Sequence, residues 1–158
     1  MGFRAASSLG KGQDIGECEM NKHIRWLRIS YWTGAIIDGL AAIQMLVASI
    51  FALTNNLPDF HPGQDYRYAM GMGASLMLGW TVLLIWADQK PTERKGILII
   101  TIFPVIFGMV VNEIWAVFYS HFLALGVVAP IWVLQALLIG LFAFSYLNAR
   151  KVDPDKNE

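Results

Sequence analysis

The sequence has 158 residues, enough for one domain, of which 56% are hydrophobic and 15% are charged. Average soluble domains are less apolar and more highly charged, so this composition favours a membrane protein. Lysine and arginine together number 12, as do aspartate and glutamate, which gives a formal net charge of zero. Neither a basic surface nor a nucleic-acid-binding motif accompanies this balance, so we expect no nucleic-acid partner.

The N-terminal segment is polar. Residues 1–21 are rich in Gly, Ser, Glu and Lys and lack apolar periodicity, so we predict a disordered tail. The one cysteine, Cys18, lies in this tail, and a single thiol excludes an intrachain disulfide and a CxxC redox pair. Met20 precedes a stretch that would make a natural start for a membrane protein. We therefore hypothesise that residues 1–19 are a dispensable or misassigned extension.

Four apolar segments follow, each long enough for a transmembrane helix. A helix rises about 1.5 Å per residue and the hydrocarbon core is about 30 Å thick, so a span needs roughly 20 residues. The predicted spans are residues 29–53, 68–86, 96–122 and 127–147, separated by segments with Pro, Gly, Asn and Asp. The sequence thus predicts an all-α integral membrane four-helix bundle over residues 22–150, followed by a polar C-terminal tail at 151–158.

Basic residues predict the orientation of the spans, because Lys and Arg in short flanking segments stay on the cytoplasmic side. They occur before the first span, between the second and third, and after the fourth: Lys22, Arg25, Arg28, Lys90, Arg94, Lys95, Arg150, Lys151 and Lys156. The opposite side has only Arg67. We therefore expect a multi-pass protein of the cell membrane, in contact with lipid, with both termini cytoplasmic.

Small residues recur every four positions in three spans. These stripes are Gly34, Asp38 and Ala42; Gly71, Ser75 and Gly79; and Gly108, Asn112, Ala116 and Ser120. Small side chains let transmembrane helices approach closely, so we interpret the stripes as helix contact faces, within one chain or in a homo-oligomer. Pro104 predicts a kink near Ile100, because proline removes a backbone donor from the helix.

Two carboxylic acids fall well inside the predicted spans, Asp38 in the first and Glu113 in the third. Charged groups in a bilayer cost several kcal/mol unless they are paired, hydrated or neutralised. No Lys, Arg or His lies in the central part of any span, although Arg67 at an outer end could reach down to Glu113. Each acid is therefore either protonated and bonded to a neighbouring helix, or beside a cavity that takes water, a proton, a metal cation or an organic amine.

Three amides lie at roughly the depth of these acids, in the outer halves of the first, third and fourth spans. They are Gln44, Asn112 and Gln135. Amides at such positions commonly form hydrogen bonds between helices. We predict a polar cluster of Asp38, Glu113 and the three amides.

No pattern in the sequence is specific for a cofactor or a catalytic centre. The outer loop, residues 59–65, and His121 contain His and Asp, but their spacing matches no metal site, and Pro62-Gly63 is typical of a hydrated turn. A Ser-His-Asp arrangement, a nucleotide-binding loop and a haem-ligand pair are not visible either. We therefore expect no metal and no cofactor.

Three functions are compatible with these features. The first is binding or transport of a small lipophilic or cationic molecule, or of protons, at a site formed by Asp38, Glu113, Asn112, Gln44, Gln135 and Arg67. The second is a noncatalytic subunit or oligomerisation module, which requires the Gly71, Ser75 and Gly79 stripe to face outward. The third is an enzyme acting on a lipid or sterol-like substrate, which requires both acids within roughly 10 Å at one cavity.

Overall fold

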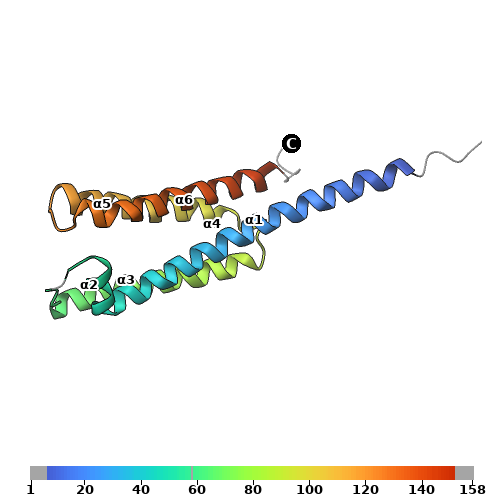
Figure 1. The fold of residues 1–158 in the computed structure, drawn as a ribbon. Helices are drawn as coiled ribbons and strands as arrows, with labels where there is room; N and C mark the ends of the chain where they lie inside the picture. Colours follow the sequence, from blue (N-terminus) through green and yellow to red (C-terminus); the bar gives the residue numbers. More distant parts are fainter. Residues whose placement is uncertain (1–6, 58, 152–158) are drawn as a thin grey trace, which may run out of the picture.

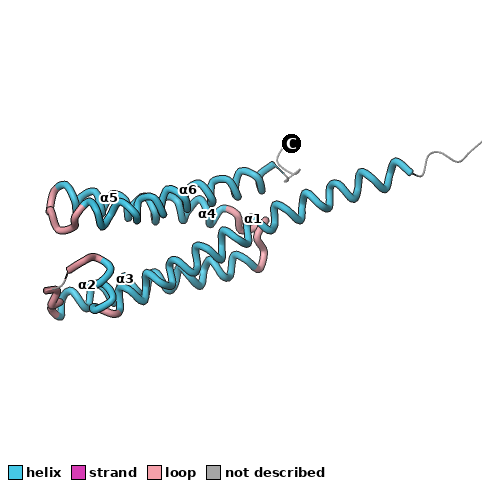
Figure 2. The backbone as a smooth tube through the Cα atoms, in the orientation of Figure 1, coloured by secondary structure: helices cyan, strands magenta, loops and turns pink. Residues whose placement is uncertain are grey.

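The structure is a computed structural model that describes residues 7–57 and 59–151, with side chains described from residue 22 onward. Within this part every regular element is helical (Figure 2). In chain order the elements are α1 (Ser7–Leu46), α2 (Ala48–Thr54), α3 (Gln64–Asp88), α4 (Gly96–Ile100), the π-helical turn η1 (Thr101–Ile106), α5 (Phe107–Phe118) and α6 (Leu125–Lys151).

Helix α1 lies between α3 and α6, while α4, η1 and α5 run along α6 (Figure 1). The α3–α4 connection and the end of α6 lie at the end of the molecule from which α1 enters, and we call this the basic end. The α2–α3 and α5–α6 connections lie at the opposite end, which we call the loop end (Figure 1). The connection that holds Lys90, Arg94 and Lys95 is thus at the same end as Arg150 and Lys151.

Three helical stretches are long and apolar enough to cross a membrane, Gln64–Asp88, Gly96–Phe118 and Leu125–Lys151. A fourth qualifies if Lys22–Leu46 and the bent α2 are taken as one span. These stretches correspond to the four apolar segments expected from the sequence. Many of their large apolar side chains, such as Leu76 and Leu137, are exposed, as lipid-facing side chains must be.

The first apolar segment, expected as a span at residues 29–53, does not form one straight helix. The helix breaks at Val47, and α2 turns away from Lys22–Leu46 by 110°. One side-chain bond spans the break, since Gln44 Nε2 donates to Thr54 Oγ1 at 2.7 Å, and at the end of α2 Asn55 Nδ2 donates to the Phe51 carbonyl at 2.9 Å. Residues 46–50 contain no Gly or Pro, so hydropathy alone gave no signal for the break.

At the N-terminal side, α1 begins at Ser7, within the segment that we expected to be disordered. No proline interrupts residues 7–46, so nothing in the covalent chain stops the helix from continuing back from the apolar segment. Residues 1–6 and the predicted tail at 152–158 lie outside the described part of the chain.

The third apolar segment is kinked, as Pro104 predicts. Phe103 leaves the helical region with φ −132° and ψ 106°, and the wider turn η1 joins α4 to α5 around it. The distortion is centred three residues beyond Ile100. A proline has no backbone N–H, so the hydrogen bonds around it rearrange into a wider turn.

The helices are packed most closely near the basic end. Leu27 and Tyr31 of α1, Leu84 of α3, Leu98 of α4 and Phe142 of α6 form a buried apolar core there. Buried polar groups need partners in an apolar medium. At this end, hydrogen bonds between polar side chains of different helices therefore add to the apolar packing.

Those bonds join α1 to its neighbours. Ser30 and Ser145 hydroxyls, both fully buried, lie 2.7 Å apart between α1 and α6. At the end of α3, the Asp88 carboxylate accepts a hydrogen bond from Trp32 Nε1 at 3.3 Å and lies 3.6 Å from Arg28 Nε. This end of the molecule is consequently well defined by both packing and polar contacts.

The small-residue stripe of α1 is a contact face, since Gly34, Asp38 and Ala42 are all buried. The stripe of α3 is different. Nothing lies within 4 Å of a Cβ built on Gly71 or Gly79, and Ser75 is exposed. The α5 stripe is likewise not a contact face within the described chain, because Gly108 and Asn112 are exposed. Helix α3 instead presents Gly73, Ala74 and Leu84 to the rest of the protein, a face rotated from the stripe.

Gly34 provides a test of this packing. A Cβ at Gly34 would lie 3.0 Å from Leu84 Cδ1 and 3.1 Å from Phe142 Cζ, so Gly34→Leu should force α1, α3 and α6 apart. We expect a loss of about 1–3 kcal/mol of stability, measured by unfolding in detergent. Gly140→Leu is the control, because nothing lies within 4 Å of its Cβ position. Equal stability of the two variants would contradict the packing described here.

Candidate functional site

A cavity of about 310 Å³ lies between α1, the η1–α5 segment and α6, on the loop-end side of the packed core. Its wall is mainly apolar, with four polar side chains. The lining residues are Gly34, Ile37, Asp38, Leu40, Ala41, Gln44, Thr101, Val105, Ile106, Met109, Ile131, Leu134, Gln135, Leu138 and Phe142. The kink around Pro104 turns η1 across this wall, so the distortion of the third apolar segment helps to shape the cavity.

Asp38 is the only ionisable side chain in the wall of this cavity. It lies one helical turn after Gly34 and one before Ala42, so it faces inward with them. Its side chain is 9% exposed, and its Oδ2 atom has no hydrogen-bond partner. A carboxyl group in this position has lost its hydration without gaining a cation, which is costly if it is ionised.

Gln135 of α6 lies in the same wall and is 5% exposed. Its Nε2 atom donates to Glu113 Oε1 of α5 at 2.9 Å. Gln135 Oε1 and Glu113 Oε2 are both buried and without a partner. Glu113 does not line the cavity itself and is connected to it through Gln135. Of the two acids, only Asp38 lines this cavity.

The remaining expected site residues have different positions. Gln44 is half-buried, lines the cavity and donates to Thr54. Asn112 is exposed and lines no part of the cavity. Arg67 forms no ion pair with Glu113 within 4.0 Å. The predicted polar cluster therefore reduces, within the described chain, to Asp38, Gln44, Gln135 and Glu113.

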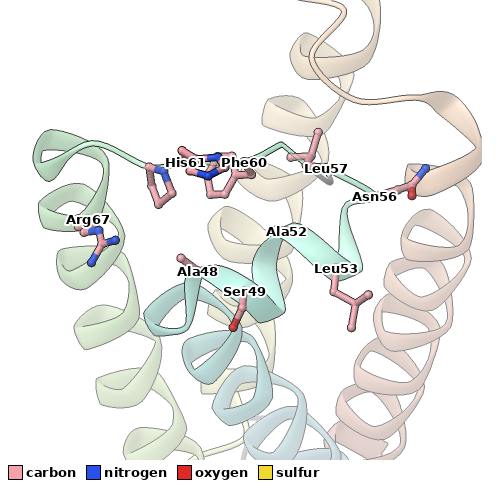
Figure 3. Close-up of a pocket in the computed structure, with 10 residues that line it drawn as sticks. Ala48, Ser49, Ala52, Leu53, Asn56, Leu57, Phe60, His61 and Arg67 are labelled. Carbon is pink, nitrogen blue, oxygen red and sulfur yellow. The ribbon is translucent and has the colours of Figure 1, made fainter.

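Arg67 belongs to a separate cleft of about 680 Å³ at the loop end. Figure 3 shows α2 lying across this end, with Ala48 and Ser49 below the cleft, Arg67 on α3 at one side, and His61 on the connecting loop. Phe51, Phe60 and Tyr66 support it, with ring centroids 5.0–5.8 Å apart. The cleft is open and its charged residue is exposed, in contrast to the buried wall around Asp38.

Thr101 is a residue of the cavity wall that sequence reasoning missed. Its hydroxyl donates to the Ile97 carbonyl at 2.8 Å and accepts from Trp80 Nε1 at 3.2 Å, which joins α3 to η1. Its bond to Ile97 is the common bond of a Thr hydroxyl to the carbonyl four residues earlier, so the available signal was only a polar residue within an apolar segment. In the described residues there is no group of three or more His, Cys, Asp or Glu that could hold a metal ion.

Comparison with known proteins returned no match to a family model, a curated protein or a solved structure. The class is therefore defined by the helices themselves. Three or four of them are long and apolar enough to cross a bilayer, and they indicate a membrane protein.

The bond between Gln135 and Glu113 can be tested with a double-mutant cycle of Gln135→Leu and Glu113→Leu. Each single change leaves a buried polar group without its partner, whereas the double change removes both. We expect a coupling of about 0.6 kcal/mol, and at most about 1.7 kcal/mol, in detergent unfolding.

The control cycle combines Gln135→Leu with Asn112→Leu. Asn112 neighbours Glu113 in sequence but is exposed, so its coupling to Gln135 should be close to zero. If the two cycles give similar coupling energies, Gln135 and Glu113 interact only through general effects on α5.

Proposed function

We propose that the protein binds or transports a small lipophilic or cationic molecule, or protons, at the cavity beside Asp38. The observation that carries this proposal is the unpartnered Asp38 carboxyl group in the wall of an otherwise mostly apolar space. An intramembrane acid without a partner is by default a functional candidate, because a purely structural position would favour an apolar residue or a paired one.

The size and position of the cavity support the same proposal. Its volume of about 310 Å³ is at the lower end of the range for ligand pockets, about 300–1,000 Å³, so it suits a small molecule. Leu40, Met109 and Leu134 line it and are also exposed on the outer surface of the helices. A molecule dissolved in the bilayer would therefore have a lateral route to Asp38.

The proposal includes an orientation. Both termini would be cytoplasmic in the cell membrane, because the Lys and Arg residues before α1's apolar part, between α3 and α4, and at the end of α6 gather at the basic end. The cavity, on the loop-end side of the core, would then lie in the outer half of the bilayer.

The test is proton release in weakly buffered nanodiscs when lipophilic amines and cations are added. A cation that displaces a proton from Asp38 should acidify the medium, and Asp38→Asn should abolish the release. Ala41→Phe should abolish it as well, because Ala41 lines the cavity and the added ring fills it without changing any charge.

Asn112→Leu is the matched control, since Asn112 is exposed and outside the cavity. Asp38 would be a structural group if the wild type released no protons with a broad panel of amines and cations and Asp38→Asn only lowered stability. If proton release persists in both Asp38→Asn and Ala41→Phe, the binding site lies elsewhere in the protein.

A second candidate function is a membrane subunit that binds another copy of itself. The outward-facing Gly71, Ser75 and Gly79 stripe favours it, because this stripe has the spacing of helix contact faces and no partner within the described chain. Burial of this stripe against other helices of the same chain would have weakened this candidate.

Self-association through α3 predicts that Gly79→Leu lowers the oligomeric mass in detergent, measured by light scattering. A leucine at the centre of the contact would keep the two backbones apart. Gly140→Leu on α6, which is equally open, should leave the mass unchanged. A wild-type protein that is monomeric in several detergents and in nanodiscs would exclude this candidate.

A further inference from the structure

The cavity contains buried polar atoms that lack partners, and when Asp38 is ionised all of them are acceptors. They are Asp38 Oδ2 and Gln135 Oε1, in side chains that are 9% and 5% exposed. Because buried polar groups in proteins are almost always hydrogen-bonded, an acceptor without a partner marks the place of a donor. We propose that this donor is a primary ammonium group on a small apolar body. The inference rests on the proposed binding function and specifies its ligand.

The polar side chains of the wall already use donor groups within the protein. Gln44 Nε2 donates to Thr54 at 2.7 Å, and Gln135 Nε2 donates to Glu113 at 2.9 Å. The Thr101 hydroxyl has a single hydrogen, which it donates to the Ile97 carbonyl. Each amide keeps one further N–H, but the buried wall atoms without a partner, Asp38 Oδ2 and Gln135 Oε1, are the ones that an N–H donor on a ligand would satisfy.

Glu113 has a positioning role in this arrangement. By accepting from Gln135 Nε2, it fixes the direction of the amide, so that Oε1 is the atom left for the cavity. Without that bond the amide could turn and present N–H groups beside Asp38. The acid of α5 thus acts on the ligand through Gln135.

The charge of the ligand follows from Asp38. It is the only ionisable side chain in the wall, so an anion would meet a carboxylate and no compensating cation. A cation gains the Coulomb interaction in a medium of low dielectric, where a charge-assisted hydrogen bond is stronger than a neutral one. The body of the ligand would contact apolar side chains such as Val105, Ile106 and Leu138.

The experiment compares 2-phenylethylammonium with its N,N,N-trimethyl analogue, which has the same charge and ring but no N–H. Binding to the wild-type protein in nanodiscs is measured by calorimetry at fixed pH and salt. We expect the trimethyl analogue to bind at least about tenfold more weakly, because it leaves the acceptors unsatisfied. This comparison needs no mutation, so it does not depend on whether a variant folds.

Three variants then locate the contact. Asp38→Asn should abolish binding of 2-phenylethylammonium, and Gln135→Met should reduce its preference over the trimethyl analogue. Glu113→Gln is the conservative control, because a glutamine oxygen can still accept from Gln135 Nε2 and hold the amide in place. Glu113→Leu should reduce the preference as Gln135→Met does.

Equal affinity for the two compounds would overturn the hydrogen-bonding proposal while leaving a cation-binding cavity intact. Binding of neither compound would overturn it as well. In that case the proposed function is judged separately, by whether other lipophilic cations cause a proton release that is sensitive to Ala41→Phe.

Discussion

The arrangement of this protein depends on one constraint: Asp38 is buried in an apolar interior without a cation. Hydration of a carboxylate is lost on burial, and neighbouring dipoles recover only part of it. In the described chain, Asp38 shares the cavity wall with Gln44, Thr101, the Gln135 amide whose Oε1 has no partner, and apolar side chains. Such a group is stable if a proton neutralises it or a ligand cation pairs with it, and both states connect the acid to what lies in the cavity.

The cavity persists because the helices are held firmly on one side of it. At the basic end, the buried core around Tyr31 and Phe142 and the Ser30–Ser145 bond fix α1 against α6. The third apolar segment is kinked at Phe103, and Thr101, Val105 and Ile106 of its turn η1 contribute to the cavity wall. Tight packing and open space are thus separated along the same helices, and Gly34 lies where they meet.

Much of this was predictable from the sequence, and what was missed has identifiable physical causes. Hydropathy located the apolar segments, and Pro104 located the kink, because both depend on local chemistry alone. The burial of Asp38 with Gly34 also followed from helical spacing. The bend at Val47 did not, because it is stabilised by Gln44–Thr54 and by ring contacts with Tyr66, which are set by the folded chain. The sequence left the direction of the Gly79 stripe open, since spacing cannot define how a helix is rotated.

Gln44 links the cavity to the loop end. Its side chain lines the cavity, while its Nε2 atom holds Thr54 at the end of α2. Helix α2 also forms the floor of the cleft beside Arg67 (Figure 3). The Gln44–Thr54 bond spans the break at Val47, so the same side chain contributes to the cavity wall and to the bend. Gln44 therefore connects the bent end of the first apolar segment with the cavity wall around Asp38.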